Sequence, residues 1–243
     1  MISAAHLSDV FVEIADTLVD DYDLILFLDS LAKHVAVVSE TEAVGLMLAD
    51  PQGPLRFMAA SNETGEMLEL YQLQNHEGPC LDCFTTGEPV VNVDLTATRK
   101  RWPVFADKAV AAGFTMVHAL PMRLRDQVIG TVNIFGNGGV PLSDDELKVV
   151  QGLADIATIA ILQERSIARA EALTEQLQGA LNSRIIIEQA KGALARSIGV
   201  SVDEAFELMR SRARSTRERL VDVSAAVLKG GSLGMDRPTK PDG

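Results

Sequence analysis

The sequence is poor in residues that hold metals or form covalent cross-links. It contains 2 cysteines and 4 histidines in 243 residues. The two thiols, Cys80 and Cys83, lie in the stretch GPCLDC, and the nearest histidine, His76, does not complete a zinc-ligand set with them. We therefore expect no metal site. The two thiols are candidates for a redox pair, but two bystander cysteines are the favoured interpretation.

Long apolar runs and targeting signals are also missing. No run approaches the ~18 to 20 uncharged apolar residues that a membrane-spanning helix needs. The N-terminus is acidic and amphipathic, with no basic region before an apolar block, so it is not a signal peptide. We expect a cytoplasmic protein without a membrane partner.

Catalytic motifs are absent as well. The sequence has no G-x-S-x-G elbow, no Walker loop and no G-x-G-x-x-G stretch. The histidines are scattered, and His118 in the apolar stretch TMVHALPM is interpreted as a satisfied structural residue. We expect neither enzymatic activity nor a cofactor, and a sensor kinase lacks the nucleotide-binding motif that it would require.

Charge is spread unevenly along the chain. Residues 1–163 hold 9 Lys/Arg against 23 Asp/Glu, a net charge of −14, whereas residues 183–229 hold 9 against 6, a net charge of +3. Such asymmetry indicates two modules with different partners. The first module repels a polyanion and the second can approach one.

The first 140 residues combine helical and strand patterns. Hairpins with helices around them predict an antiparallel sheet covered by helices, an α+β domain. The polar stretch 75–89 is interpreted as a long loop, and such a domain can enclose a mostly apolar cleft for an unidentified small molecule. The expected helices are 3–19, about 24–37, 62–74 and 102–114, and the expected strands are 42–50, 55–61, 90–94, 115–124 and 127–136.

One long helix, or two nearly continuous ones, is expected beyond residue 142. Ser143 and Glu146 form a capping box, with Leu142 as a hydrophobic staple. No proline follows until after Ser197, and apolar residues recur with spacings of 3 and 4. This pattern favours a coiled-coil dimer over a helix that packs back on its own domain.

The basic C-terminal stretch predicts a three-helix unit. Capping boxes are expected at Ser201 with Glu204 and at Ser215 with Glu218. In SRIIIEQAKGALAR, the residues Arg184, Glu188 and Lys191 share a helix face. Charge alone leaves two interpretations open, which are phosphate binding and an ion-pair ladder on a solvated face.

Residues 183–228 resemble an ANTAR domain, an RNA-binding three-helix module of bacterial transcription antiterminators. The spacing of the family's landmarks holds over these 46 residues. Upstream, HEGPCLDCFTTGEPVVNVDL, RWPVFADKAVAAGF and ALPMRLRDQVIGTVNIFG are similar to the GAF domains of actinobacterial GAF–ANTAR regulators. The landmarks are Arg184, Ile187, Ala190-Lys191-Gly192, Ala205-Phe206, Leu208, Arg210, Ala213, Leu220 and Val223; Ala195, Glu218 and Ser224 depart from the usual residues.

The resemblance implies a GAF sensor over residues 1–140, a dimerising helical linker over 141–182, an ANTAR domain over 183–229 and a disordered tail over 230–243. It implies a signal-responsive antiterminator that binds RNA with two small stem-loops, one loop for each ANTAR domain of a homodimer. The alternative is a small-molecule or redox sensor whose basic helices recruit a protein partner. The RNA-binding residues implied are Arg184, Lys191, Gly192, Arg196, Arg210, Arg214 and Arg217.

Overall fold

The structure is a computed structural model that describes residues 8, 10–14, 23–50, 53–138 and 141–230. The chain divides into two compact units, Met1–Arg165 and Ser166–Gly243. In the helix expected over 3–19, residues 10–14 are helical and most of the remainder lies outside the described residues. The tail beyond residue 230, expected to be disordered, also lies outside them.

The first unit is built on a five-stranded sheet, which confirms the predicted α+β fold. The strand order is β2-β1-β5-β4-β3, and every neighbouring pair is antiparallel. Both predicted hairpins are present, since β1 pairs with β2 and β4 pairs with β5. The strands are β1 (Ala43–Ala49), β2 (Leu55–Ala60), β3 (Val90–Asp94), β4 (Met116–Leu124) and β5 (Gln127–Gly136).

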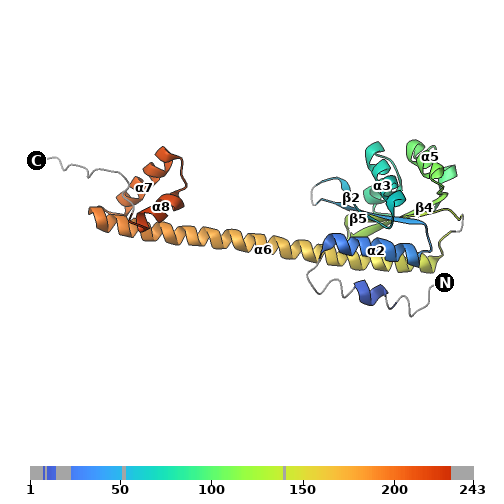
Figure 1. Ribbon diagram of the computed structural model, residues 1–243, viewed down its shortest axis with the longest axis horizontal. Coiled ribbons are helices and arrows are strands. Elements are labelled where there is room, and N and C mark those ends of the chain that lie inside the picture. Colours follow the sequence, from blue (N-terminus) through green and yellow to red (C-terminus); the bar gives the residue numbers. More distant parts are fainter. Residues whose placement is uncertain (1–7, 9, 15–22, 51–52, 139–140, 231–243) are drawn as a thin grey trace, which may run out of the picture. The chain divides into compact units, whose positions relative to one another are not determined.

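Two helices cover one face of the sheet (Figure 1). They are α2 (Leu24–Val38) and the first turns of α6 (Asp144–Ile198). Their apolar residues, such as Leu31 and Leu153, are fully buried against strand residues such as Leu46. Apolar residues that repeat every 3.6 positions on the helices thus pack against strand residues that repeat every second position, and together they form one core.

Three helices lie on the opposite face: α3 (Glu63–Asn75), α4 (Pro79–Thr86) and α5 (Pro103–Ala111). The helix α4 occupies the stretch 75–89, so the prediction of a long loop there was wrong. Proline in the first turn loses no intrahelical hydrogen bond, and Gly87 ends the helix in a left-handed conformation with φ of 71°. Two turns are too short to show a helical period.

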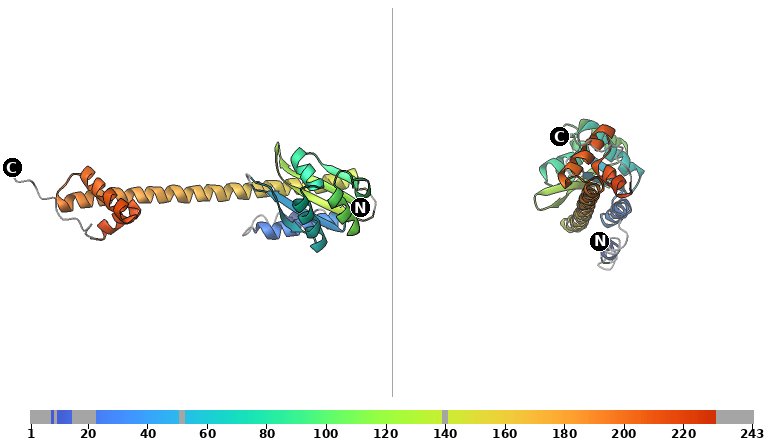
Figure 2. Two further views of the ribbon diagram at one scale, coloured as in Figure 1. Left: turned by 90° about the horizontal axis from the view of Figure 1, so that it is seen from above. Right: turned by 90° about the vertical axis from the view of Figure 1, so that its left-hand side faces the viewer.

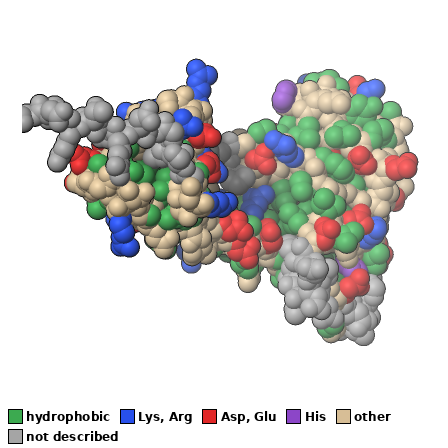
Figure 3. Space-filling model, turned by 60° about the vertical axis from the view of Figure 1, so that its left-hand side comes forward, with side chains coloured by type: hydrophobic (Ala, Val, Ile, Leu, Met, Phe, Trp, Pro, Cys, Tyr) green, Lys and Arg blue, Asp and Glu red, His purple; other side chains and the backbone are tan. Residues whose placement is uncertain are grey.

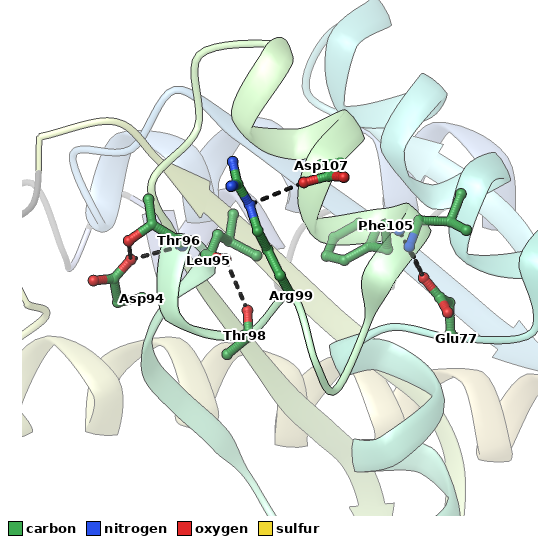
Figure 4. Close-up of polar contacts among 9 residues, drawn as sticks. Glu77, Asp94, Leu95, Thr96, Thr98, Arg99, Phe105 and Asp107 are labelled. Carbon is green, nitrogen blue, oxygen red and sulfur yellow. Dashed lines mark hydrogen bonds and ion pairs between the residues drawn. The ribbon is translucent and has the colours of Figure 1, made fainter.

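Side chains from outside α5 hold its first turns (Figure 4). Glu77 Oε1 accepts hydrogen bonds from the backbone N–H of Phe105 at 2.7 Å and from that of the preceding residue at 2.6 Å. Arg99 Nε lies 2.9 Å from Asp107 Oδ1. The first N–H groups of a helix have no intrahelical partner, so a carboxylate here stabilises the helix and fixes its position.

The helix α6 is one continuous helix, the first of the two alternatives that the sequence left open. Ser143 and Glu146 form the expected capping box: the Ser143 N–H donates to Glu146 Oε2 at 2.8 Å, and the Glu146 N–H donates to Ser143 Oγ at 3.3 Å. Leu142 is buried beside them, as a hydrophobic staple requires. The described residues contain no helix long and apolar enough to cross a membrane.

The second unit contains the predicted three-helix arrangement. The end of α6 packs with α7 (Val202–Thr216) and α8 (Leu220–Leu228) around Ala190, Met209 and Val223 (Figure 2). The capping box of Ser201 and Glu204 is confirmed.

The expected capping box of Ser215 and Glu218 was wrong. Ser215 lies in the last turn of α7, and α8 begins only at Leu220. Arg217 ends α7 in a left-handed conformation, with φ of 57°. Glu218 accepts a hydrogen bond from Thr216 Oγ1 at 2.8 Å instead of capping a helix.

Gly130 on β5 provides a test of the strand register. A Cβ at this position would collide with the carbonyl oxygen of Met47 on β1, which is backbone and cannot rotate away. Gly130→Ala is expected to lower the free energy of unfolding by about 1–3 kcal/mol. Gly152→Ala in α6 meets no heavy atom within 4 Å and is expected to raise it by about 1 kcal/mol. Denaturant titration measures the free energy of unfolding of both variants. Equal values for Gly130→Ala and Gly152→Ala would contradict the pairing of β1 with β5.

Candidate functional site

The predicted RNA-binding residues all lie in the second unit. Arg184, Lys191, Gly192 and Arg196 belong to α6, Arg210 and Arg214 belong to α7, and Arg217 follows α7. All are exposed except Lys191. Lys and Arg side chains project from several separate places on the visible surface and do not form one dense patch (Figure 3).

Lys191 is turned towards α7. Its side chain is only 16% exposed, and its Nζ lies 3.0 Å from Glu188 Oε2 and 3.1 Å from Glu188 Oε1. The same Nζ lies 5.2 Å from the centre of the Phe206 ring, in a cation–π contact. Of the two interpretations that charge left open, the ion pair is therefore present within α6, and the contact with Phe206 joins α6 to α7. Phosphate binding by Lys191 stays a prediction.

Gly192 lies on a different face of α6 from Lys191. Apart from the backbone of α6 itself, no heavy atom of the described residues lies within 4 Å of the position that a Cβ would occupy at Gly192, so this side of the helix is open. Ile185, Gln189 and Arg196 share its exposed face, at spacings of 4, 3 and 4 residues along α6. The face exposes backbone, an amide side chain and a guanidinium, which together suit close approach by another chain.

The exposed arginines differ in their pairing. Arg210 Nη1 lies 3.5 Å from Glu207 Oε1, and Arg219 binds Asp222 through Nε and Nη2 at 2.8 and 2.9 Å. Within the part of the chain that the structure describes, no ion pair involves Arg184 or Arg196. These two guanidinium groups can bind an anion without first breaking an internal ion pair.

The candidate redox pair occupies an unreactive environment. Cys80 and Cys83 are both free thiols and both buried in α4. Burial raises the pKa of Cys83 to about 12 and the pKa of Cys80 well above its ordinary value. Reactive cysteines have lowered pKa values and solvent access, so these two resemble core residues. The described residues contain no cluster of three potential metal ligands.

A buried polar cluster lies between the sheet and α3. Glu69 accepts hydrogen bonds from Asn133 Nδ2 at 2.7 Å and from Gln72 Nε2 at 2.9 Å, and it lies against Gly45, where a side chain would collide with it. Burial raises the pKa of Glu69 to about 8, against the lowering effect of these hydrogen bonds. Asn133 Oδ1 has no partner. A half-turn of the Asn133 amide would let Oδ1 accept the proton of a neutral Glu69 carboxyl.

The fold and the arrangement of units define the class of protein. An antiparallel sheet with helices on both faces, followed by a long helix that ends in a three-helix unit, matches two families. Residues 9–162 match the GAF domain family and residues 175–228 match the ANTAR domain family. The chain belongs to the GAF domain family and carries an ANTAR domain at its C-terminal end.

Solved GAF domains share the fold of the first unit. The chain is similar to the GAF domain of an Acinetobacter phosphoenolpyruvate-protein phosphotransferase (14% identity, TM-score 0.53, covering 68% of this chain and 98% of that one). The chain is also similar to the GAF domain of a phosphoenolpyruvate-protein phosphotransferase from Coxiella burnetii, with 14% identity and a TM-score of 0.53. The match covers 69% of this chain and 99% of that one. Free methionine-R-sulfoxide reductase from Neisseria meningitidis is similar with 16% identity and a TM-score of 0.51. That match covers 69% of this chain and 96% of the reductase. One fold thus serves different functions, and no curated protein matches the chain.

Glu69 predicts a pH dependence of stability. Its folded-state pKa is raised to about 8 from 4.5, so between these values the folded protein keeps a proton that the unfolded chain releases. The free energy of unfolding should therefore fall as pH rises from 5 to 7, by on the order of 1 kcal/mol per pH unit from this group. Urea titrations at several pH values, followed by fluorescence of the single, buried Trp102, measure the slope.

Matched variants separate Glu69 from other carboxylates. Glu69→Gln should lose this slope, whereas Glu63→Gln, which alters an acidic residue in the first turn of the same helix, should keep it. An equal slope in all three proteins would contradict the assignment to Glu69.

Proposed function

We propose that the protein is a signal-responsive, RNA-binding transcription antitermination regulator that acts in the cytoplasm and is not an enzyme. The observation that carries the proposal is the joining of a GAF domain and an ANTAR domain by one helix, α6. The GAF domain is the sensor. The ANTAR domain binds stem-loop RNA in an mRNA leader, as in the actinobacterial GAF–ANTAR regulators that the sequence resembles.

The surface of the second unit supports RNA over DNA duplex as the partner. Its arginines lie on α6, on α7 and in the connection between α7 and α8, and residues 183–229 carry a net charge of only +3 (9 Lys/Arg against 6 Asp/Glu). Such a surface binds phosphates weakly. Unpaired loop bases offer edges and faces that arginine and amide side chains can bind, so loops add contacts that a regular duplex lacks.

Two copies of the chain are proposed to act together through α6. Every residue from 166 to 182 is exposed in the single chain, including Leu173 at 55%, Leu177 at 58% and Leu181 at 57%. A helix of this length without packing is only marginally stable in water. A second copy would bury the leucines, and two weak ANTAR domains on one dimer would bind two loops far more tightly than one.

Exposed and covered cations are expected to contribute differently to RNA binding. Arg196→Gln removes an exposed guanidinium and should weaken binding to a two-stem-loop RNA. It should also reduce the salt slope, which is the fall of log K with the logarithm of salt concentration, by roughly 0.7–0.9. Lys191→Met keeps the aliphatic contact with Phe206 and should change the salt slope little, because its charge already pairs with Glu188. Filter binding between low and physiological salt measures both.

Controls for this experiment are a scrambled RNA of equal length and the melting temperature of each variant. Unchanged affinity and slope in Arg196→Gln, Arg184→Gln and Arg214→Gln together would overturn the RNA assignment. Capture of a protein partner by the same surface, without RNA, would favour the alternative of a sensor that recruits a protein.

Leu177 is expected to hold the proposed dimer together. Leu177→Lys places a charge in the leucine stripe and should yield a monomeric mass in light scattering at concentrations where the wild-type protein is dimeric. Ala168→Lys adds the same charge on the opposite face of α6 and should remain dimeric. A monomeric wild-type protein at high concentration would refute the paired helices.

A further inference from the structure

A small cavity lies in the first unit where α2, β4 and α6 come together. Its volume is about 280 Å³, close to the lower end of the range for small-molecule sites. It is not lined by any described Lys or Arg residue. Its polar and charged lining residues are Ser39, Glu40, Thr41, Glu42, His118 and Glu146, and Leu142 lies in the same wall.

His118 presents a hydrogen-bond donor to this cavity. The residue is only 1% exposed, and its Nδ1 accepts a hydrogen bond from the Asn92 N–H at 3.0 Å. Burial lowers the pKa of His118 to about 4, so the neutral ring carries its proton on Nε2 at pH 7. Nε2 has no hydrogen-bond partner among the described residues. The expectation of a satisfied structural histidine therefore holds for only one of the two ring nitrogens.

Three carboxylates, those of Glu40, Glu42 and Glu146, line the cavity. Glu42 Oε2 accepts a hydrogen bond from the Asn137 N–H at 2.9 Å, which fixes the side chain. Glu146 Oε2 accepts from Ser143 Oγ at 2.7 Å, and these hydrogen bonds lower the pKa of Glu146. In Glu42 and Glu146, Oε1 makes no hydrogen bond or ion pair with any other described residue, so each keeps an oxygen for a donor from a ligand.

His118 is connected to the start of α6 through Asn92. Asn92 adopts a left-handed backbone conformation with φ of 52°. Its side chain donates to the Leu142 carbonyl at 3.1 Å and accepts from the Leu142 N–H at 2.9 Å. Leu142 directly precedes the capping box of α6. A molecule bound to Nε2 is thus separated from the first turn of α6 by only three hydrogen-bonded residues.

We propose that this cavity binds a small molecule with an ammonium group and a hydrogen-bond-accepting oxygen, and that it is the signal site of the GAF domain. The oxygen accepts the proton of His118 Nε2, and the ammonium group binds Glu42 and Glu146. A cation fits because the charged residues that line the cavity, Glu40, Glu42 and Glu146, are all acidic and the first 163 residues carry a net charge of −14 (9 Lys/Arg against 23 Asp/Glu). The signalling role rests on the proposed function, whereas binding itself does not.

Glycinamide, which has both groups, is the probe for this site. Isothermal titration of the full-length protein with glycinamide should show binding. Acetamide, which lacks the ammonium group, and methylammonium, which lacks the oxygen, should each bind at least roughly tenfold more weakly. Absence of glycinamide binding, or equal binding of all three probes, would overturn the proposal.

Matched variants locate the binding. His118→Asn keeps an acceptor for the Asn92 N–H but removes the Nε2 donor, and Glu42→Gln keeps an acceptor for the Asn137 N–H but removes the charge. Each should weaken glycinamide binding by roughly tenfold at an unchanged melting temperature. Glu63→Gln on α3 is the control and should bind like the wild-type protein. Equal binding by His118→Asn would place the ligand elsewhere.

RNA binding without glycinamide is measured separately, so the two proposals can fail independently. Loss of glycinamide binding with intact RNA binding would refute only this site. Intact glycinamide binding without RNA binding would refute only the antiterminator assignment.

Discussion

The packing of the first turns of α6 against the sheet is the interaction on which the remaining structure depends. Val150, Leu153 and Ile161 are fully buried there, and the same helix continues to Ala190 and Leu194 in the core of the second unit. Helix formation is cooperative, so each core stabilises the turns next to it. The exposed stretch 166–182 receives no such support within one chain, and this imbalance is the physical argument for a second copy.

Much of the fold could be predicted because strands and long helices leave strong periodic signals. All five strands, the α+β class and a helical stretch from residue 144 were predicted from apolar spacing together with turn signals and the Ser143–Glu146 capping box. The helix α4 was missed because eight residues between Pro79 and Thr86 give only two turns. The pair Ser215 and Glu218 has capping-box spacing, but the packing of Ala213 in the core extends α7 past this point.

The candidate site was less predictable, because a sequence records charge and spacing but not which partner a side chain chooses. Lys191 and Arg184 share a face, yet only Lys191 faces Phe206, a residue 15 positions later. Gly192 was named only through the family resemblance, and the sequence did not show that the space beside it is free of other side chains among the described residues. His118 shows the same limit: its apolar neighbours in the strand conceal that Nε2 faces a cavity.

A ligand can change the output of the protein only if it binds two conformations with different affinity. The contact of Asn92 with Leu142 suits such a role, since Asn92 holds a strained backbone conformation and also binds His118. Leu142 and the Ser143–Glu146 capping box fix where α6 begins, and Glu146 belongs both to that capping box and to the cavity wall. A ligand cation on Glu146 Oε1 would share this carboxylate with the capping hydrogen bonds on Oε2 and would weaken them. The proposed site therefore couples ligand binding to the start of α6, a helix that continues into the second core.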